Sequence, residues 1–147
     1  MSLEVKVTAQ TPLLPTENVE KVKTALLNMV NVDADNVHIE EVDDHSEMIV
    51  SGEGQDTLQK LHTLFREKRI LGAARRTLRR GIRDHRIYFY LNKQAAFVGN
   101  PSFVDEFTNE SPLGPIEIEI STNNPEKLID WLAPRTRNGK IISERTY

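Results

Sequence analysis

Nine arginine and lysine side chains are concentrated between residues 66 and 86 of this 147-residue chain. They are Arg66, Lys68, Arg69, Arg75, Arg76, Arg79, Arg80, Arg83 and Arg86. Only two acids, Glu67 and Asp84, stand among them, so the segment carries a charge of +7, whereas residues 1–65 carry −8 and residues 87–147 carry −2. The overall charge of −3 therefore conceals a strong asymmetry, which indicates a surface that binds anions.

Arginine predominates in this basic segment, and its planar guanidinium donates two parallel hydrogen bonds to a phosphate group. Almost no acid stands four residues from an arginine, so few pairs can form along a helix and the like charges would repel one another. We therefore favour a phosphate-binding surface over the simpler alternative of a solvated charged face.

The spacing of the apolar residues predicts that the basic segment is a helix from about residue 70 to residue 80, ended by Gly81. The apolar residues that fall on one stripe of this helix are Ile70, Leu71, Ala74 and Leu78, with Ile82 extending it. The cations that fall on the opposite side are Arg69, Arg76, Arg80 and Arg83, with Arg75 and Arg79 beside them. Such a helix packs on a core with one stripe and offers its outer face to anions.

The residues before the basic helix predict a strand, a helix, a hairpin and a second helix. Residues 3–11 alternate apolar and polar side chains, as in a strand with one buried face. Thr16 can cap a helix whose apolar positions continue to Val30, and residues 37–42 and 46–51 flank an acidic turn. A helix containing Leu58 to Phe65 follows, which completes a split βαβ arrangement of the ferredoxin-like kind.

The residues after the basic helix predict the middle of the sheet. The continuous apolar run at residues 87–91 is typical of a central strand covered on both faces, so we expect Tyr88, Phe89 and Tyr90 in the core, where at most some could stack on bases. A short helical turn should follow at the exit of this strand. If the basic helix lies beside that exit, Lys93 and Gln94 would extend the arginine surface.

Residues 116–120 predict a further strand, Pro125 starts a helix that ends before Pro134, and a polar tail begins at about residue 135. The length suits one cored domain, so we predict a single α+β domain over residues 1–147, with a mixed sheet and helices packed on it. No apolar run approaches the roughly 18 residues needed to cross a bilayer, and no signal-peptide pattern opens the chain, so we expect no membrane contact and a cytoplasmic location.

Catalytic and metal-binding side chains form no complete constellation in the sequence. The chain has no cysteine, which removes disulfides and thiolate chemistry. His38 and His45 flank a turn rich in carboxylates that resembles a metal site, but such turns are often acidic for conformational reasons. His62 and His85 have no partner at ligand spacing, and phosphate-binding loops and serine elbows are absent. We predict a protein without catalysis, metal or cofactor.

Four stretches in this order carry a resemblance that covers nearly the whole chain: Ala73-Ala74-Arg75-Arg76, Leu91-Asn92-Lys93-Gln94-Ala95-Ala96-Phe97-Val98-Gly99, Leu113-Gly114-Pro115-Ile116 and Ala133-Pro134-Arg135-Thr136. The chain resembles the archaeal RNA-binding family of small uncharacterised proteins, uncharacterised protein family zero-two-zero-one. The resemblance implies a fold like that of ribosomal protein L-five, with the ferredoxin-like fold as the alternative. It also draws attention to Arg75, Asn92, Lys93, Gln94 and Gly99, for which it implies no catalytic role.

We therefore expect a non-catalytic RNA-binding protein, associated with RNA processing, whose arginine-rich helix contacts the phosphate backbone. The residues that we expect to contact RNA are Arg69, Arg75, Arg76, Arg79, Arg80, Arg83, Asn92, Lys93 and Gln94. Two alternatives remain open. The basic helix could dock on an acidic protein surface, including the acidic first half of a second copy, or the protein could be a metal-dependent RNA-processing enzyme.

Overall fold

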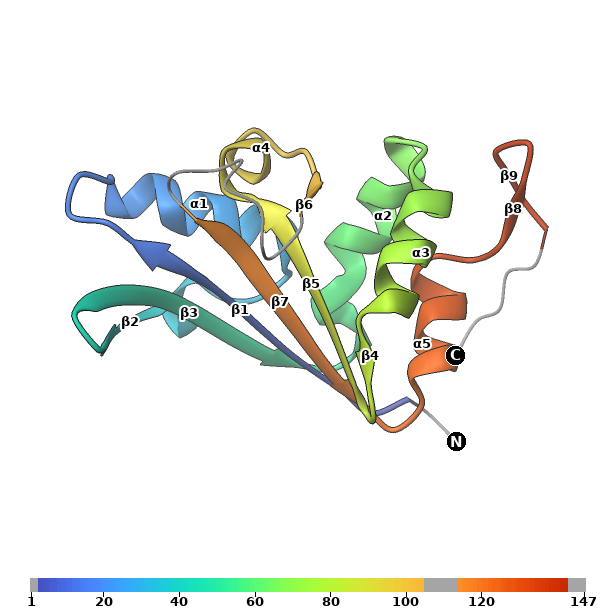
Figure 1. Cartoon of the computed structure of the whole chain (residues 1–147), viewed down its shortest axis with the longest axis horizontal. Helices are drawn as coiled ribbons and strands as arrows, with labels where there is room; N and C mark the ends of the chain where they lie inside the picture. The colour runs from blue at the N-terminus through green and yellow to red at the C-terminus, as the bar shows by residue number, and fades with distance from the viewer. Residues whose placement is uncertain (1–2, 105–113, 143–147) are drawn as a thin grey trace.

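The computed structural model describes residues 3–104 and 114–142 and shows a sheet with helices against it (Figure 1). The first elements are β1 (Val5–Leu13), α1 (Val19–Met29), β2 (His38–Val42), β3 (His45–Glu53), α2 (Gln59–Glu67) and α3 (Leu71–Arg80), with 3₁₀ turns at Ala34–Asn36 and Gln55–Leu58. The later elements are β4 (Ile82–Arg83), β5 (Arg86–Asn92), α4 (Lys93–Phe97), β6 (Phe103–Val104), β7 (Pro115–Thr122), α5 (Pro125–Leu132), β8 (Thr136–Arg137) and β9 (Lys140–Ile141). The α+β class predicted from the sequence is confirmed.

The strands of the main sheet lie in the order β2-β3-β1-β7-β5-β4, and β6 also pairs with β5. Because β3 lies between β1 and β2, the first half of the chain forms the predicted split βαβ arrangement. The prediction of a mixed sheet was wrong in one respect, since every strand pair in the described residues is antiparallel. The reason is that β7 inserts between β1 and β5 and runs opposite to both.

The strand β5 is not the middle of the sheet, as its apolar run had predicted. It lies next to the two-residue strand β4, and the positions in the middle belong to β1 and β7. Its side chains alternate, with Ile87, Phe89 and Leu91 buried and Tyr88 and Tyr90 half-buried on the other face. The run looked continuous because tyrosine combines an apolar ring with a polar tip, so it suits a half-buried face as well as a core.

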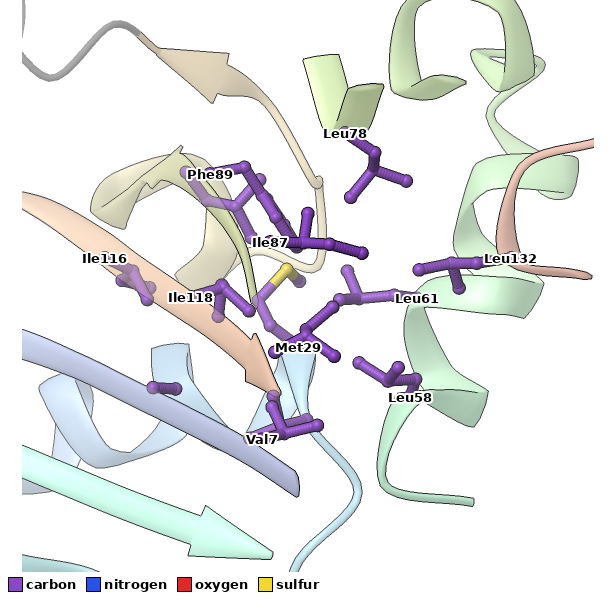
Figure 2. Packing of buried hydrophobic residues seen from close by; sticks show 14 of the residues in the cluster. Val7, Met29, Leu58, Leu61, Leu78, Ile87, Phe89, Ile116, Ile118 and Leu132 are labelled. Atoms are coloured by element: carbon purple, nitrogen blue, oxygen red, sulfur yellow. The ribbon is translucent and has the colours of Figure 1, made fainter. Parts of the chain in front are cut away.

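The core lies between one face of the sheet and the helices (Figure 2). Alternate residues of β1, β5 and β7 point into it, and Met29 from α1, Leu61 from α2, Leu78 from α3 and Leu132 from α5 meet them there. Side chains on the opposite face of β1, β5 and β7 are half-buried or exposed. The sheet therefore has one buried face and one face that water reaches.

Several helix boundaries follow from particular residues. The side chain of Asn18, not the predicted Thr16, caps α1 by accepting hydrogen bonds from the backbone amides of Glu20 and Lys21. A turn with positive φ at Arg69 separates α2 from α3, so the basic helix is distinct from its predecessor. Within the described residues, no helix is long and apolar enough to cross a membrane.

Candidate nucleic-acid interface

The helix α3 matches the predicted basic helix. Its apolar residues Leu71, Ala74 and Leu78 are buried against the core, as the spacing predicted. It ends at Gly81, which lies so close to β5 that an added Cβ would collide with the backbone carbonyl of Tyr88. The amide of Tyr88 also donates a hydrogen bond to the carbonyl of Gly81, at 3.0 Å. These contacts fix the C-terminal end of α3 beside β5.

Two of the predicted RNA-contacting arginines are paired with acids of α5. The guanidinium of Arg75 forms an ion pair with the carboxylate of Asp130, at 2.9 Å, and donates a hydrogen bond of 3.1 Å to the carbonyl of Ala133. Only 12% of the Arg75 side chain is exposed, so little of it is accessible for the predicted contact with RNA. Arg79 lies 3.0 Å from Glu126, and both of these side chains are about half exposed. These pairs fasten α3 to α5.

Four other predicted arginines remain exposed, and none of them has a carboxylate partner in the part of the chain that the structure describes. They are Arg69, Arg76, Arg80 and Arg83, called here the free arginines. Arg76 and Arg80 stand one turn apart on the same side of α3. One guanidinium nitrogen of Arg83 donates to the carbonyls of Arg80 and Ile82, at 2.9 and 2.7 Å, and this holds Arg83 beside the end of the helix.

The predicted extension of this surface by residues 92–94 was wrong for Lys93. Its ammonium group is buried and donates hydrogen bonds to the carbonyl of Pro12, at 2.7 Å, and to the carboxylate of Glu17, at 3.1 and 3.2 Å. The two charged side chains are only 4% and 7% exposed. Burial lowers the pKa of Lys93 below its ordinary value, and the contact with Glu17 opposes that shift. The lysine links α4 to the end of β1 and to the turn before α1.

The neighbours of Lys93 also lie away from the free arginines. The side-chain oxygen of Asn92 accepts a hydrogen bond from the amide of Ala95, so Asn92 caps α4. Gln94 is exposed beside Lys21 and Phe97, in a hollow between α1 and α4. Figure 1 shows α4 over the α1 end of the sheet, apart from α3. The structure thus does not bring residues 92–94 together with the arginines of α3.

An open groove of about 650 Å³ lies at the C-terminal end of α3. Its lining includes Arg80 and Arg83 from the helix end and β4, and Tyr88 and Tyr90 from β5. The hydroxyl of Tyr88 donates a 2.8 Å hydrogen bond to Glu119 on β7. This groove was not predicted, because both tyrosines were expected in the core. The signal that could have revealed it is their spacing, since residues two apart on a strand share a face.

The histidines and acids of the β2–β3 hairpin do not form a cluster. His38 lies 3.1 Å from Glu40, whereas His45 lies 3.3 Å from Glu47 and 4.0 Å from Asp44. Among residues 3–104 and 114–142, no group of three or more such side chains is placed to hold a metal ion. We therefore take the free arginines and the adjoining tyrosines as the candidate site.

Comparison with known proteins gives a family whose description names RNA binding. Residues 6–122 match a family model described as RNA binding. The chain is 41% identical to a UPF0201 protein of Metallosphaera sedula over 94% of its own length and 92% of the relative's. It is 42% identical to a UPF0201 protein of Methanopyrus kandleri over 95% of its own length and 91% of the relative's.

A solved structure has the same fold. The crystal structure of a UPF0201 protein from Methanococcus jannaschii is 32% identical and superposes with a TM-score of 0.76, covering 94% of this chain and 99% of that one. A protein of the DUF54 type from Methanothermobacter thermautotrophicus, at 17% identity and a TM-score of 0.62, shares the fold alone.

Proposed function

Because the chain belongs to the family whose model is described as RNA binding, together with the archaeal UPF0201 proteins, we propose that it binds RNA through the free arginines. The observation that carries this proposal is the contrast within α3. Arg75 and Arg79 are paired with acids of α5, whereas Arg76 and Arg80 have no carboxylate partner among the described residues.

The physical basis is electrostatic. Like charges four residues apart on a helix destabilise it by about 0.2–0.5 kcal/mol per pair, and a phosphate between the two guanidinium groups removes that repulsion. Arg83 continues the row past the helix end, where backbone carbonyls hold its guanidinium in place. Arg69 lies at the other end of α3, so the free arginines span the length of the helix. A row of this kind suits a phosphate backbone, which repeats its charge along a line.

The proposal is for binding without catalysis, in the cytoplasm and in association with RNA processing. Contacts to phosphate position a protein on RNA and carry little sequence information. We therefore expect the free arginines to bind many RNA sequences with similar affinity.

The test is a charge reversal with a matched control. Arg76→Glu combined with Arg80→Glu changes the net charge by −4, and Lys6→Glu combined with Lys21→Glu makes the same change on exposed lysines of β1 and α1. Fluorescence anisotropy with a labelled, mixed-sequence RNA at low salt should show at least about tenfold weaker binding for the arginine variant and less than threefold for the lysine variant. Equal losses in both variants would mean that net charge alone, and not α3, governs binding.

A second candidate, self-association, is favoured by one observation. The strand β2 is an exposed edge that carries Glu40 and Glu41, and the basic helix of a second copy could dock on these acids. Analytical ultracentrifugation without RNA tests this candidate. A dimer that Arg76→Glu and Arg80→Glu dissociate would support it, and a monomer at all concentrations would refute it.

A further inference from the structure

We infer that the groove at the C-terminal end of α3 takes an unpaired RNA base, so that the protein binds single-stranded RNA in preference to a duplex. This inference rests on the proposed function and specifies its substrate. Its evidence is the meeting of two tyrosines with two of the free arginines in one open groove, called here the tyrosine groove.

The groove exists because the edge of β5 is only partly covered. The strand β4 pairs with residues 86 and 87, and β6 pairs with residues 90 and 91, on the side away from β7. The segment between these two short strands faces the groove. The end of α3 forms the adjoining wall, and the close contact at Gly81 holds it there.

The two tyrosines are near neighbours on one face of β5, and both line the groove. Tyr88 and Tyr90 lie two residues apart on the solvent-facing side of the sheet, so their Cα atoms are about 6.8 Å from each other. Phe89 between them points into the core and anchors the strand. The hydrogen bond from Tyr88 to Glu119 restrains its ring before any ligand arrives. Aromatic rings on an open sheet face are a recurring platform for unpaired bases.

The charges of the groove orient the ligand. Arg80 and Arg83 line one side, and Arg83 uses one guanidinium nitrogen to hold its position, which leaves other N–H groups for a phosphate. Glu117 also lines the groove, and its negative charge disfavours a phosphate beside it. We therefore place the base over the tyrosines and the phosphate at the arginines.

A duplex cannot use this groove in the same way. Its bases are stacked inside the helix, and its surface offers phosphates and 2′-hydroxyl groups. A fully paired RNA would contact the free arginines only, whereas a single strand would add base stacking. Stacking on an aromatic side chain strengthens binding by about 5- to 150-fold per base.

The test compares a single-stranded RNA with a blunt duplex of equal length by fluorescence anisotropy, in the wild type and in four variants. Tyr88→Leu and Tyr90→Leu remove the rings, and Tyr88→Phe and Tyr90→Phe keep them as controls. Each leucine variant should bind the single strand about 5- to 150-fold more weakly, with less than a twofold change for the duplex. The phenylalanine variants should stay within about threefold of the wild type for both RNAs.

A second measurement needs no substitution and so does not depend on how the variants fold. The wild type should bind an abasic strand of the same length and charge more weakly than the RNA single strand, by at least the factor that each leucine variant loses. Equal affinity for the abasic and intact strands, or for the single strand and the duplex, would overturn the inference.

The outcomes also separate this inference from the proposed function. If Arg76→Glu with Arg80→Glu loses both RNAs while the leucine variants keep the single strand, only the tyrosine groove is refuted. If the arginine variant keeps both RNAs, the proposed function itself fails.

Discussion

Replacing Arg75 or its neighbour Arg76 should have opposite consequences, although the two arginines are adjacent in the sequence. Arg75→Met removes the ion pair with Asp130 and the hydrogen bond to Ala133 from a side chain that is 12% exposed. Breaking a fully buried ion pair costs about 3–5 kcal/mol, but Asp130 is 35% exposed and water partly replaces its partner. We therefore expect a loss of about 2–3 kcal/mol in the free energy of unfolding.

Thermal unfolding followed by circular dichroism gives the first measurement for this pair. For a chain of this length, 1 kcal/mol shifts the melting temperature by about 3 °C, so Arg75→Met should lower it by about 6–9 °C. Arg76→Met should lower it by less than about 2 °C, because an exposed side chain with no carboxylate partner among the described residues contributes less than about 0.5 kcal/mol.

RNA affinity, measured well below both melting temperatures, should show the reverse order. Arg75→Met should stay within about twofold of the wild type, while Arg76→Met should weaken binding by removing a phosphate contact. If Arg75→Met melts with the wild type, or if Arg76→Met is as unstable as Arg75→Met, the assignment of one arginine to the fold and the other to the ligand is refuted.

Three further predictions concern the contacts that hold the site and its surroundings. Lys93→Met should lower the free energy of unfolding in urea by about 3–5 kcal/mol, because the Glu17 carboxylate stays buried without its ion-pair partner. The double variant with Glu17→Leu should recover most of that loss. Equal stability of the single and double variants would contradict the buried pair. Burial holds the pKa of Lys93 in the folded chain below its ordinary value of 10.5, so the unfolded chain binds more protons at a pH between the folded and unfolded pKa values. The free energy of unfolding should therefore rise with pH over that interval, relative to the double variant. Parallel pH profiles of the two proteins would contradict the lowered pKa. Gly81→Ala should cost about 1–3 kcal/mol in the same assay, because its methyl group collides with the carbonyl of Tyr88, and an unchanged midpoint would show that α3 and β5 are less closely held.

The basic helix could be predicted from sequence because its signals are local. The stripe of Leu71, Ala74 and Leu78 fixes both the period of the helix and the face that is buried. The pairing of the arginines could not be predicted, because their partners belong to another element. Arg79 and Glu126 are 47 residues apart, and no local pattern indicates that α5 packs beside α3.

The same limit explains the errors at β5 and Lys93. A short apolar run fits a central strand as well as an amphipathic one, and only the partner strands decide which is present. The burial of Lys93 depends on Glu17, which lies 76 residues earlier in the chain. A lysine at the start of a helical turn is predicted to be exposed unless its buried partner is known. Lys93 was therefore predicted to belong to the arginine surface.

The salt dependence of RNA binding tests the central claim most directly, because it counts phosphate contacts. The slope of log K against log salt concentration changes by about 0.7 for each single-strand phosphate that a cation neutralises. The wild type and the double variant Arg76→Gln with Arg80→Gln are titrated with the same single-stranded RNA between about 50 and 200 mM salt. Their slopes should differ by about 1.4, because the variant lacks two cations. Parallel lines would show that these two arginines do not touch phosphate and would contradict the account.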